Sequence, residues 1–501
     1  MPGASAPMVR VRRRRPQTGG SLDTRSVSLR CLLLVVAVIA AFVYAGWGAG
    51  SSTLIWVLLG LLAFAAFFGG CALYNRPFPP VRFDAPGYAL RSVQLDDFGT
   101  FWDAQQAESV LAEVESSWQA TNTLVVVFIH GWHHNAAADD PNIADFSGVL
   151  RMLSEQLASP SRTTLRLQLT GHSDVRLMGL YVGWRGRSLP GVLDYANLWW
   201  RKLAAERVGD GDASEFLERL QLKYLRANSI KREPVQSSCK PFMGLVTMGH
   251  SLGGQVLLKS VARSLEVELT KRAPRLADVT GAPQPGPRSP ERVPVGSLGD
   301  LNILLNPAAE AYQFGRIDAL YRQIVYPPEQ TPQLVVFSAD DDQPRKAFFP
   351  IARVLTLPFR PAFRNAYQGE LWGRALGELQ AQRTHVLRRA EATTPDSLTD
   401  DDYRLDNGRR VKEHDFSDET AFGGVRLTRD PATPSGHNPI ANSPIAVIKT
   451  TDGIIDGHNG IFRPEFQNFL GSYVAFIEGK RVLVRHDRFD RSIAQERGND
   501  H

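Results

Sequence analysis

The residues that most clearly carry chemistry form the segment Gly249–Gly254, which reads GHSLGG. An apolar run, 245–248, precedes it, and a helical pattern of apolar residues follows it. A serine on a tight strand-to-helix turn holds its hydroxyl clear of the backbone, and the flanking glycines let strand and helix approach closely. The free N–H groups of the first helical turn then face the developing negative charge. We therefore predict that Ser251 is a nucleophile.

A serine hydroxyl is a poor nucleophile near neutral pH, so it needs a base and a third group that orients the base. Two other loops supply suitable residues after apolar, strand-like segments. The acidic run Asp340–Asp342 follows the segment 334–338, and His458 follows the segment 445–449. Because the carboxyl ends of parallel strands meet at one edge of a sheet, these side chains are expected to lie near Ser251.

The acidic run leaves the identity of the third group open. Counting forward from Ser338 favours Asp341, whereas counting back from the Phe-Pro pair at 349–350 favours Asp342, and Asp340 is not excluded. For the base, His458 is preferred because it follows an apolar strand and precedes a terminal helix, with His437 as the second choice. Two more histidines compete from a poorly patterned region: His385 and His414.

These motifs resemble the α/β-hydrolase superfamily, on its lipase and esterase side. The resemblance covers roughly residues 120–480 and rests on four places: His130-Gly131 after the first apolar strand, the Gly249–Gly254 turn, the acidic loop, and Gly457-His458. The order serine, acid, histidine is the one found in that superfamily. The segments 306–308 (NPA) and 348–350 (FFP) also resemble a bacterial esterase-like subgroup.

The resemblance implies an oxyanion hole formed by the backbone N–H groups of Trp132 and Leu252. Such donors lower the barrier by about 2.7–4 kcal/mol each in well-studied enzymes. We interpret the His130 side chain as a structural hydrogen-bonding group. His133 and His134 are adjacent on a loop and point in different directions, so we interpret them as a polar site mouth and expect no metal site.

The function expected from these residues is hydrolysis of carboxylic esters through an acyl-enzyme, without a cofactor. An acyltransferase or thioesterase would use the same triad, and a membrane scaffold that retained the fold without turnover is the third hypothesis. A hydrophobic ester or acyl substrate is expected from a membrane location. Four tryptophans are candidates for the walls of an acyl pocket, although a place in the core suits each of them equally well: Trp184, Trp199, Trp200 and Trp372.

The elements that must position these residues alternate between strand and helix. Continuous apolar runs at 124–129, 177–184 and 334–338 are typical of strands buried on both faces. Helical patterns occupy 103–118 and 142–157, among others, and a closing helix is expected over 464–478. The alternation predicts an α/β fold with a mostly parallel, doubly wound sheet, as in α/β-hydrolases. Two regions are candidates for a cap over the site: 192–227 and the insertion at about 357–440.

The N-terminal region predicts membrane attachment. No charged residue lies between Arg30 and Arg76, and two apolar spans fit within residues 31–74, with a break at 47–52. We predict a transmembrane hairpin, preceded by a disordered basic tail (1–30) that stays cytoplasmic and keeps the catalytic domain cytoplasmic. The alternative is a lipoprotein signal that ends at Cys71. Residues 75–119 form the linker and the start of the body, 120–480 the catalytic domain, and 481–501 a C-terminal tail.

Charge and cysteine content narrow the choice of partners. The formal net charge is +5, but seven arginines and one aspartate in residues 1–30 account for +6, which leaves the remainder close to neutral. A nearly neutral body lacks the basic surface that nucleic-acid binding requires, so no nucleic-acid partner is expected. Membrane lipid is the expected partner, and the arginine tail suits anionic headgroups. Three cysteines imply no disulfide framework, and the oligomeric state is left open.

Overall fold

The structure is a computed structural model in which the chain divides into two compact units, Met1–Leu73 and Tyr74–His501. It describes residues 60, 76–170, 172–188, 194, 197–228, 241–280, 289–290, 293–343, 345, 362–391, 405–406, 409–410, 420–422, 424–430, 440 and 442–499. The predicted basic tail lies outside these residues, and so does the predicted hairpin apart from residue 60. Within the described residues, no helix combines the length and the apolar character that a membrane crossing requires.

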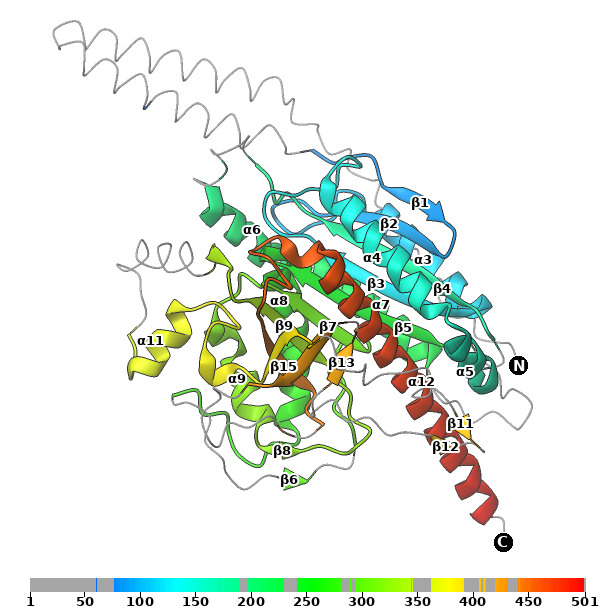
Figure 1. The fold of residues 1–501 in the computed structure, drawn as a ribbon. Helices are drawn as coiled ribbons and strands as arrows, with labels where there is room; N and C mark the ends of the chain where they lie inside the picture. Colours follow the sequence, from blue (N-terminus) through cyan, green and yellow to red (C-terminus); the bar gives the residue numbers. More distant parts are fainter. Residues whose placement is uncertain are drawn as a thin grey trace, which may run out of the picture. The chain divides into compact units, whose positions relative to one another are not determined.

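An eleven-stranded sheet runs through the second unit (Figure 1). Seven of its neighbouring pairs, from β2 across to β10, are parallel, and the pairs at the two ends are antiparallel. The predicted mixed α/β fold with a mostly parallel sheet is therefore confirmed. In spatial order the strands are β1 (Arg82–Ala85), β2 (Tyr88–Gln94), β4 (Val175–Gly183), β3 (Asn122–Ile129), β5 (Met243–His250), β7 (Leu301–Leu305), β9 (Leu334–Ala339), β15 (Ile445–Thr450), β10 (His385–Arg389), β14 (Val425–Arg429) and β13 (Thr420–Phe422).

The central strands are buried on both faces because helices cover each side. Every residue of β3 and β5 is buried, as their continuous apolar sequences predict. One core cluster joins one face of the sheet to α3 (Ala104–Ala120), α6 (Leu198–Asp210), α7 (Asp212–Ala227), α8 (Leu252–Thr270) and α9 (Ala311–Tyr321). The other joins the opposite face to α4 (Pro141–Leu157) and α12 (Pro464–Asn499), which contacts α5 (Pro160–Thr170); Figure 1 shows α4 and α12 side by side.

The structure describes parts of three regions that figure in the expected domain organisation. Helices α6 and α7, within the predicted cap region 192–227, pack into the core that covers one face of the sheet. The predicted insertion at 357–440 supplies strands β10, β14 and β13 at one edge of the same sheet, as well as α11 (Ala366–Gly373). Helix α12 continues to Asn499, through the predicted C-terminal tail. The edge strands are short and rich in arginine, so they lack the apolar pattern that marks the central strands.

Candidate active site

The turn between β5 and α8 holds Ser251 in a strained backbone conformation. Its φ is 54° and its ψ is −120°, a region that residues with a side chain rarely adopt. The glycines on either side make the turn possible. A Cβ on Gly249 would lie 2.5 Å from the Gly253 carbonyl oxygen, and one on Gly253 would lie 2.1 Å from the carbonyl oxygen of Ile129. The predicted glycine-dependent close approach is therefore present.

Neighbouring elements fix the Ser251 backbone from both sides. Its N–H donates to the Leu305 carbonyl at the end of β7 (3.0 Å), and its own carbonyl accepts from Ala308 N–H (2.9 Å) and Gly254 N–H (3.0 Å). These hydrogen bonds connect the turn to the end of β7, the neighbouring strand. They therefore fix the position of the serine at the carboxyl ends of the parallel strands. Its side chain is mostly buried, with 5% of the residue exposed.

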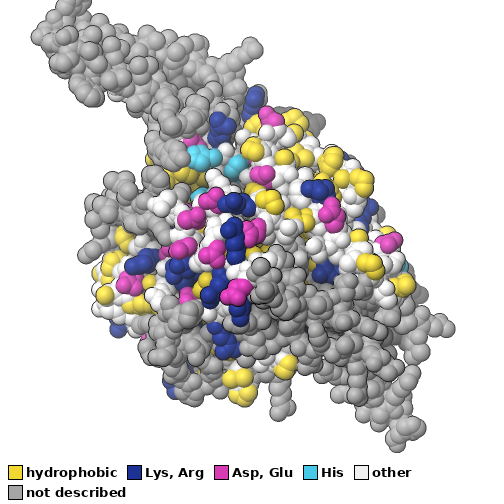
Figure 2. All heavy atoms as spheres, in the orientation of Figure 1, with side chains coloured by type: hydrophobic (Ala, Val, Ile, Leu, Met, Phe, Trp, Pro, Cys, Tyr) yellow, Lys and Arg dark blue, Asp and Glu magenta, His cyan; other side chains and the backbone are white. Residues whose placement is uncertain are grey.

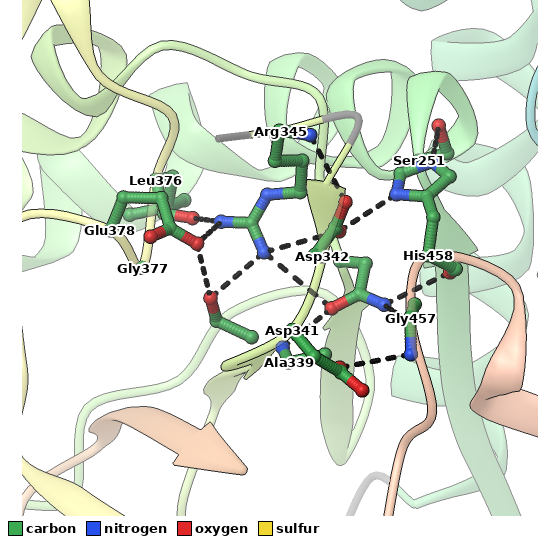
Figure 3. Close-up of polar contacts among 12 residues, drawn as sticks. Ser251, Ala339, Asp341, Asp342, Arg345, Leu376, Gly377, Glu378, Gly457 and His458 are labelled. Atoms are coloured by element: carbon green, nitrogen blue, oxygen red, sulfur yellow. Dashed lines mark hydrogen bonds and ion pairs between the residues drawn. The ribbon is translucent and has the colours of Figure 1, made fainter. Parts of the chain in front are cut away.

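Three side chains from the loops that follow β5, β9 and β15 form a continuous series of hydrogen bonds (Figure 3). The Nε2 atom of His458 lies 2.7 Å from the Oγ atom of Ser251, and its Nδ1 atom lies 2.7 Å from Oδ2 of Asp342. Because a carboxylate only accepts, Nδ1 carries the proton and Nε2 is left to accept the serine hydroxyl. The Asp342 side chain is fully buried, whereas 17% of the His458 side chain remains exposed.

The structure distinguishes the three candidate acids by their partners. Asp342 alone contacts the imidazole of His458 in this way. Asp341, its equal candidate from the sequence, points to the loop instead, where its Oδ1 accepts from Gly457 N–H at 2.9 Å (Figure 3). Asp340 forms an ion pair with Lys449 at 2.7 Å. Asp341 therefore holds the loop that carries His458 and does not orient the imidazole itself.

The carbonyl group of His458 is held by two side chains that the sequence did not single out. It accepts from Asn306 Nδ2 at 2.9 Å and from His250 Nε2 at 3.0 Å. Asn306 has a positive φ of 43° at the end of β7, a conformation that asparagine tolerates better than most residues. Burial, with the charge of His458, lowers the pKa of His250 well below its usual value, so His250 stays neutral and keeps the proton on Nε2.

The loop after β3, which is predicted to carry one oxyanion donor, is held by the buried ring of His130. His130 Nδ1 donates to the Gly131 carbonyl (2.8 Å), and its Nε2 accepts from Trp184 N–H (3.0 Å). Burial lowers the pKa of His130 to about 4, so the ring is neutral and structural, as the sequence predicts. A Cβ on Gly131 would lie 2.8 Å from Cβ of Ser251, which places this loop against the nucleophile.

The two predicted oxyanion donors lie on either side of this contact. Trp132 follows Gly131, and its ring stacks on His133 with centroids 3.8 Å apart. Leu252 begins α8, so its N–H belongs to the first turn, whose donors have no partner within the helix. Both backbone N–H groups therefore belong to the segments that meet at Ser251.

The other histidines that the sequence singled out have partners or positions of their own. His133 and His134 each pair with a carboxylate of their own, Asp194 at 2.7 Å and Asp140 at 2.9 Å. His385 is buried on β10, while His437 and His414 lie outside the described residues. Histidines gather at one spot on the face in Figure 2, beside interspersed acidic and basic side chains. Within the ranges described, no three His, Cys, Asp or Glu side chains form a group that could hold a metal ion.

The candidate pocket tryptophans have different environments. Trp184 is buried in the core and stacks on His130, with ring centroids 5.7 Å apart, so it packs against the loop after β3. Trp200 is 53% exposed on α6, and Trp372 packs on Phe363. The side chain of Trp199 lies outside the part of the chain that the structure describes. These observations define no acyl pocket.

Sequence reasoning missed a third residue beside the acid, Arg345. Its backbone N–H donates to Oδ1 of Asp342 at 3.0 Å, and its guanidinium lies behind the same carboxylate. The sequence offered no signal for it, because two of its other partners, the Leu376 carbonyl and Glu378, come from a distant segment. His250 and Asn306 are more accessible to such reasoning, since both sit within motifs already noted.

Comparisons of the chain with protein-family models, with curated proteins and with solved structures gave no match.

Proposed function

We propose that the protein is a serine hydrolase that cleaves carboxylic esters through an acyl-enzyme. The observation that carries the proposal is the unbroken contact from Ser251 Oγ through both ring nitrogens of His458 to Asp342, with 2.7 Å at each step. A nucleophile, a base and an orienting acid in these contacts are what acyl transfer requires. The short distance between Ser251 and His458 also weighs against the scaffold hypothesis.

In the proposed reaction His458 Nε2 takes the hydroxyl proton while Ser251 Oγ bonds to the substrate carbonyl carbon. The N–H groups of Trp132 and Leu252 bind the resulting oxyanion. His458 then gives the proton to the leaving alkoxide, which departs as an alcohol and leaves the acyl-enzyme. Water repeats the sequence: His458 accepts its proton, the hydroxyl attacks the acyl carbon, and Ser251 recovers its proton as the acid leaves. Asp342 stays ionised and stabilises the imidazolium.

We further propose that the fold belongs to the α/β-hydrolase superfamily and that residues 31–74 attach the enzyme to a membrane as a hairpin. The strained serine between β5 and α8 supports the first part, as does the acid after β9 and the histidine after β15. The uncharged interval from Arg30 to Arg76 supports the second. The expected substrate is a hydrophobic ester presented at a membrane.

The test is hydrolysis of a series of p-nitrophenyl esters of increasing acyl length by the full chain and by Ser251→Ala. The proposal predicts turnover by the wild-type protein and loss of turnover in a folded Ser251→Ala variant. Turnover retained by that variant would refute the role of Ser251. Acyl transfer to an added alcohol in preference to water would instead favour the acyltransferase alternative.

A further inference from the structure

Arg345 is a buried cation directly behind the triad acid. Its side chain is 2% exposed, and Nη1 lies 3.8 Å from Oδ2 of Asp342, the oxygen that also binds His458. Figure 3 shows the guanidinium between this carboxylate and the segment at 376–378. Nη1 donates to Ser338 Oγ at 2.8 Å, and Nη2 donates to the carbonyl oxygen of Leu376. These hydrogen bonds hold the Arg345 guanidinium in one orientation.

The charges around Arg345 alternate in sign and extend away from the triad. Glu378 lies on the far side of the guanidinium, with 3.4 Å between Oε1 and Nη2, and Arg383 lies 3.9 Å from the same carboxyl group. Burial lowers the pKa of Arg345, while Glu378 and Asp342 oppose that shift, and an arginine keeps its proton in proteins. Asp342 is therefore one end of a chain of compensated charges.

Other charged and titratable groups face Asp342 and Arg345 from the neighbouring elements. His458 contacts Asp342 from the loop after β15, and the neutral His250 lies against His458, with ring centroids 5.1 Å apart. Asp341 binds the backbone of the same loop. Asp340 is neutralised by Lys449 on β15. Arg345 is the cation that these contacts place against Asp342.

We propose that Arg345 is a positioning residue of the triad, which keeps the buried Asp342 carboxylate ionised and fixed toward His458. This inference rests on the proposed function. An unpaired carboxylate is costly to bury. Among the described residues, Asp342 receives hydrogen bonds from the Arg345 backbone N–H and the His458 imidazole, and the guanidinium adds an opposite charge at 3.8 Å. The guanidinium also opposes uptake of a further proton by the Asp342–His458 pair, because that proton would add positive charge beside a cation.

The sign of the effect on activity follows from this geometry. Without the guanidinium, the Asp342–His458 pair gains its extra proton more easily, so the acid limb of the kcat/KM profile moves to higher pH. A shift of roughly one pH unit is expected from a cation within about 4 Å. Removal of the negative charge on Glu378 leaves Arg345 uncompensated and moves the limb the other way, by a smaller amount because Glu378 is more distant.

The experiment measures kcat/KM for a p-nitrophenyl ester against pH in the full chain and in Arg345→Met, Arg345→Lys and Glu378→Gln. We expect the acid limb to move up in Arg345→Met, to return toward the wild-type position in Arg345→Lys, and to move down in Glu378→Gln. Arg322→Met is the matched control, since it removes another buried arginine, paired with Asp318 at 2.9 Å; its limb should not move.

The possible outcomes separate this inference from the proposed function. A wild-type protein without esterase activity would refute the proposed function itself. An active wild type whose Arg345 and Glu378 variants lose activity equally at every pH would overturn the inference, because a purely structural role lowers the amount of active protein without moving the limb. If Arg345→Met does not fold, an unmoved limb in Glu378→Gln overturns the inference on its own.

Discussion

Replacement of Asp342 by asparagine tests how the acid acts on the base. Oδ1 of Asp342 accepts from Arg345 N–H at 3.0 Å, so the amide oxygen of the new side chain takes that position and its NH₂ group faces Nδ1 of His458. The reverse orientation would set one donor against another. The amide NH₂ must donate to Nδ1, which forces the imidazole proton onto Nε2. Nε2 then faces the Ser251 hydroxyl as a donor and no longer takes its proton.

The expected loss in kcat is about 10⁴-fold, the value for the same change in a well-studied serine protease. It corresponds to about 5.5 kcal/mol of transition-state stabilisation, since each factor of ten is worth about 1.4 kcal/mol. The assay is single-turnover release of p-nitrophenol from an activated ester, because it reports acylation of the serine without a contribution from product release. Circular dichroism of the same preparation establishes that the variant is folded.

Asp341→Asn is the matched control, one residue away and with the same change in charge. The Asp341 side chain accepts a backbone N–H from Gly457, and an amide oxygen can replace it there, so we expect a loss below about tenfold. Equal losses in the two variants, or a larger loss in Asp341→Asn, would refute the assignment of the acid that the hydrogen bonds support.

Two further predictions concern stability. Gly253→Ala should lower the free energy of unfolding by at least the roughly 1–3 kcal/mol typical of overpacking, because the new methyl group would meet backbone atoms at the end of β3. Gly373→Ala is the control, since a Cβ there has no atom within 4 Å, and it should leave denaturant unfolding unchanged. Similar unfolding midpoints for the two variants would contradict this prediction. Burial lowers the pKa of His385 to about 4, so the unfolded chain binds its proton first and stability falls as pH drops below about 6.5. Between about pH 6.5 and pH 5, the free energy of unfolding of His385→Gln should therefore fall by about 1.5 kcal/mol less than that of the wild type. Parallel pH dependences of the two proteins in urea unfolding would refute this prediction.

The parts of the fold that the sequence could predict are those with local patterns. The continuous apolar runs of β3, β4 and β9 indicate strands buried on both faces, and the GHSLGG segment carries its turn chemistry within six residues. The edge strands escaped prediction because tertiary pairing, rather than an apolar pattern, holds them in the sheet. Their sequences, HVLRR in β10 and VRLTR in β14, are short and charged.

The candidate site also contains residues that the sequence could predict and residues that it could not. The positions of Ser251, His458 and the acidic run after strand-like segments predicted that they lie close together at the carboxyl ends of the strands. The same positions could not decide whether Asp341 or Asp342 is the acid. That distinction depends on how the chain turns after β9, where one carboxylate faces the imidazole and the other faces a backbone N–H. Arg345 depends on a distant segment of the chain, through the Leu376 carbonyl and Glu378, so no local pattern marks it.

Labelling with a fluorophosphonate probe, followed by peptide mapping, tests directly whether Ser251 is an activated nucleophile. Such a probe reacts with a serine whose hydroxyl is activated by a base, independently of the substrate. We expect one probe molecule to bond to Ser251 in the wild-type protein, with labelling lost in Ser251→Ala and slowed in Asp342→Asn. Folded wild-type protein that takes up no label, or that is labelled on another serine, would contradict it.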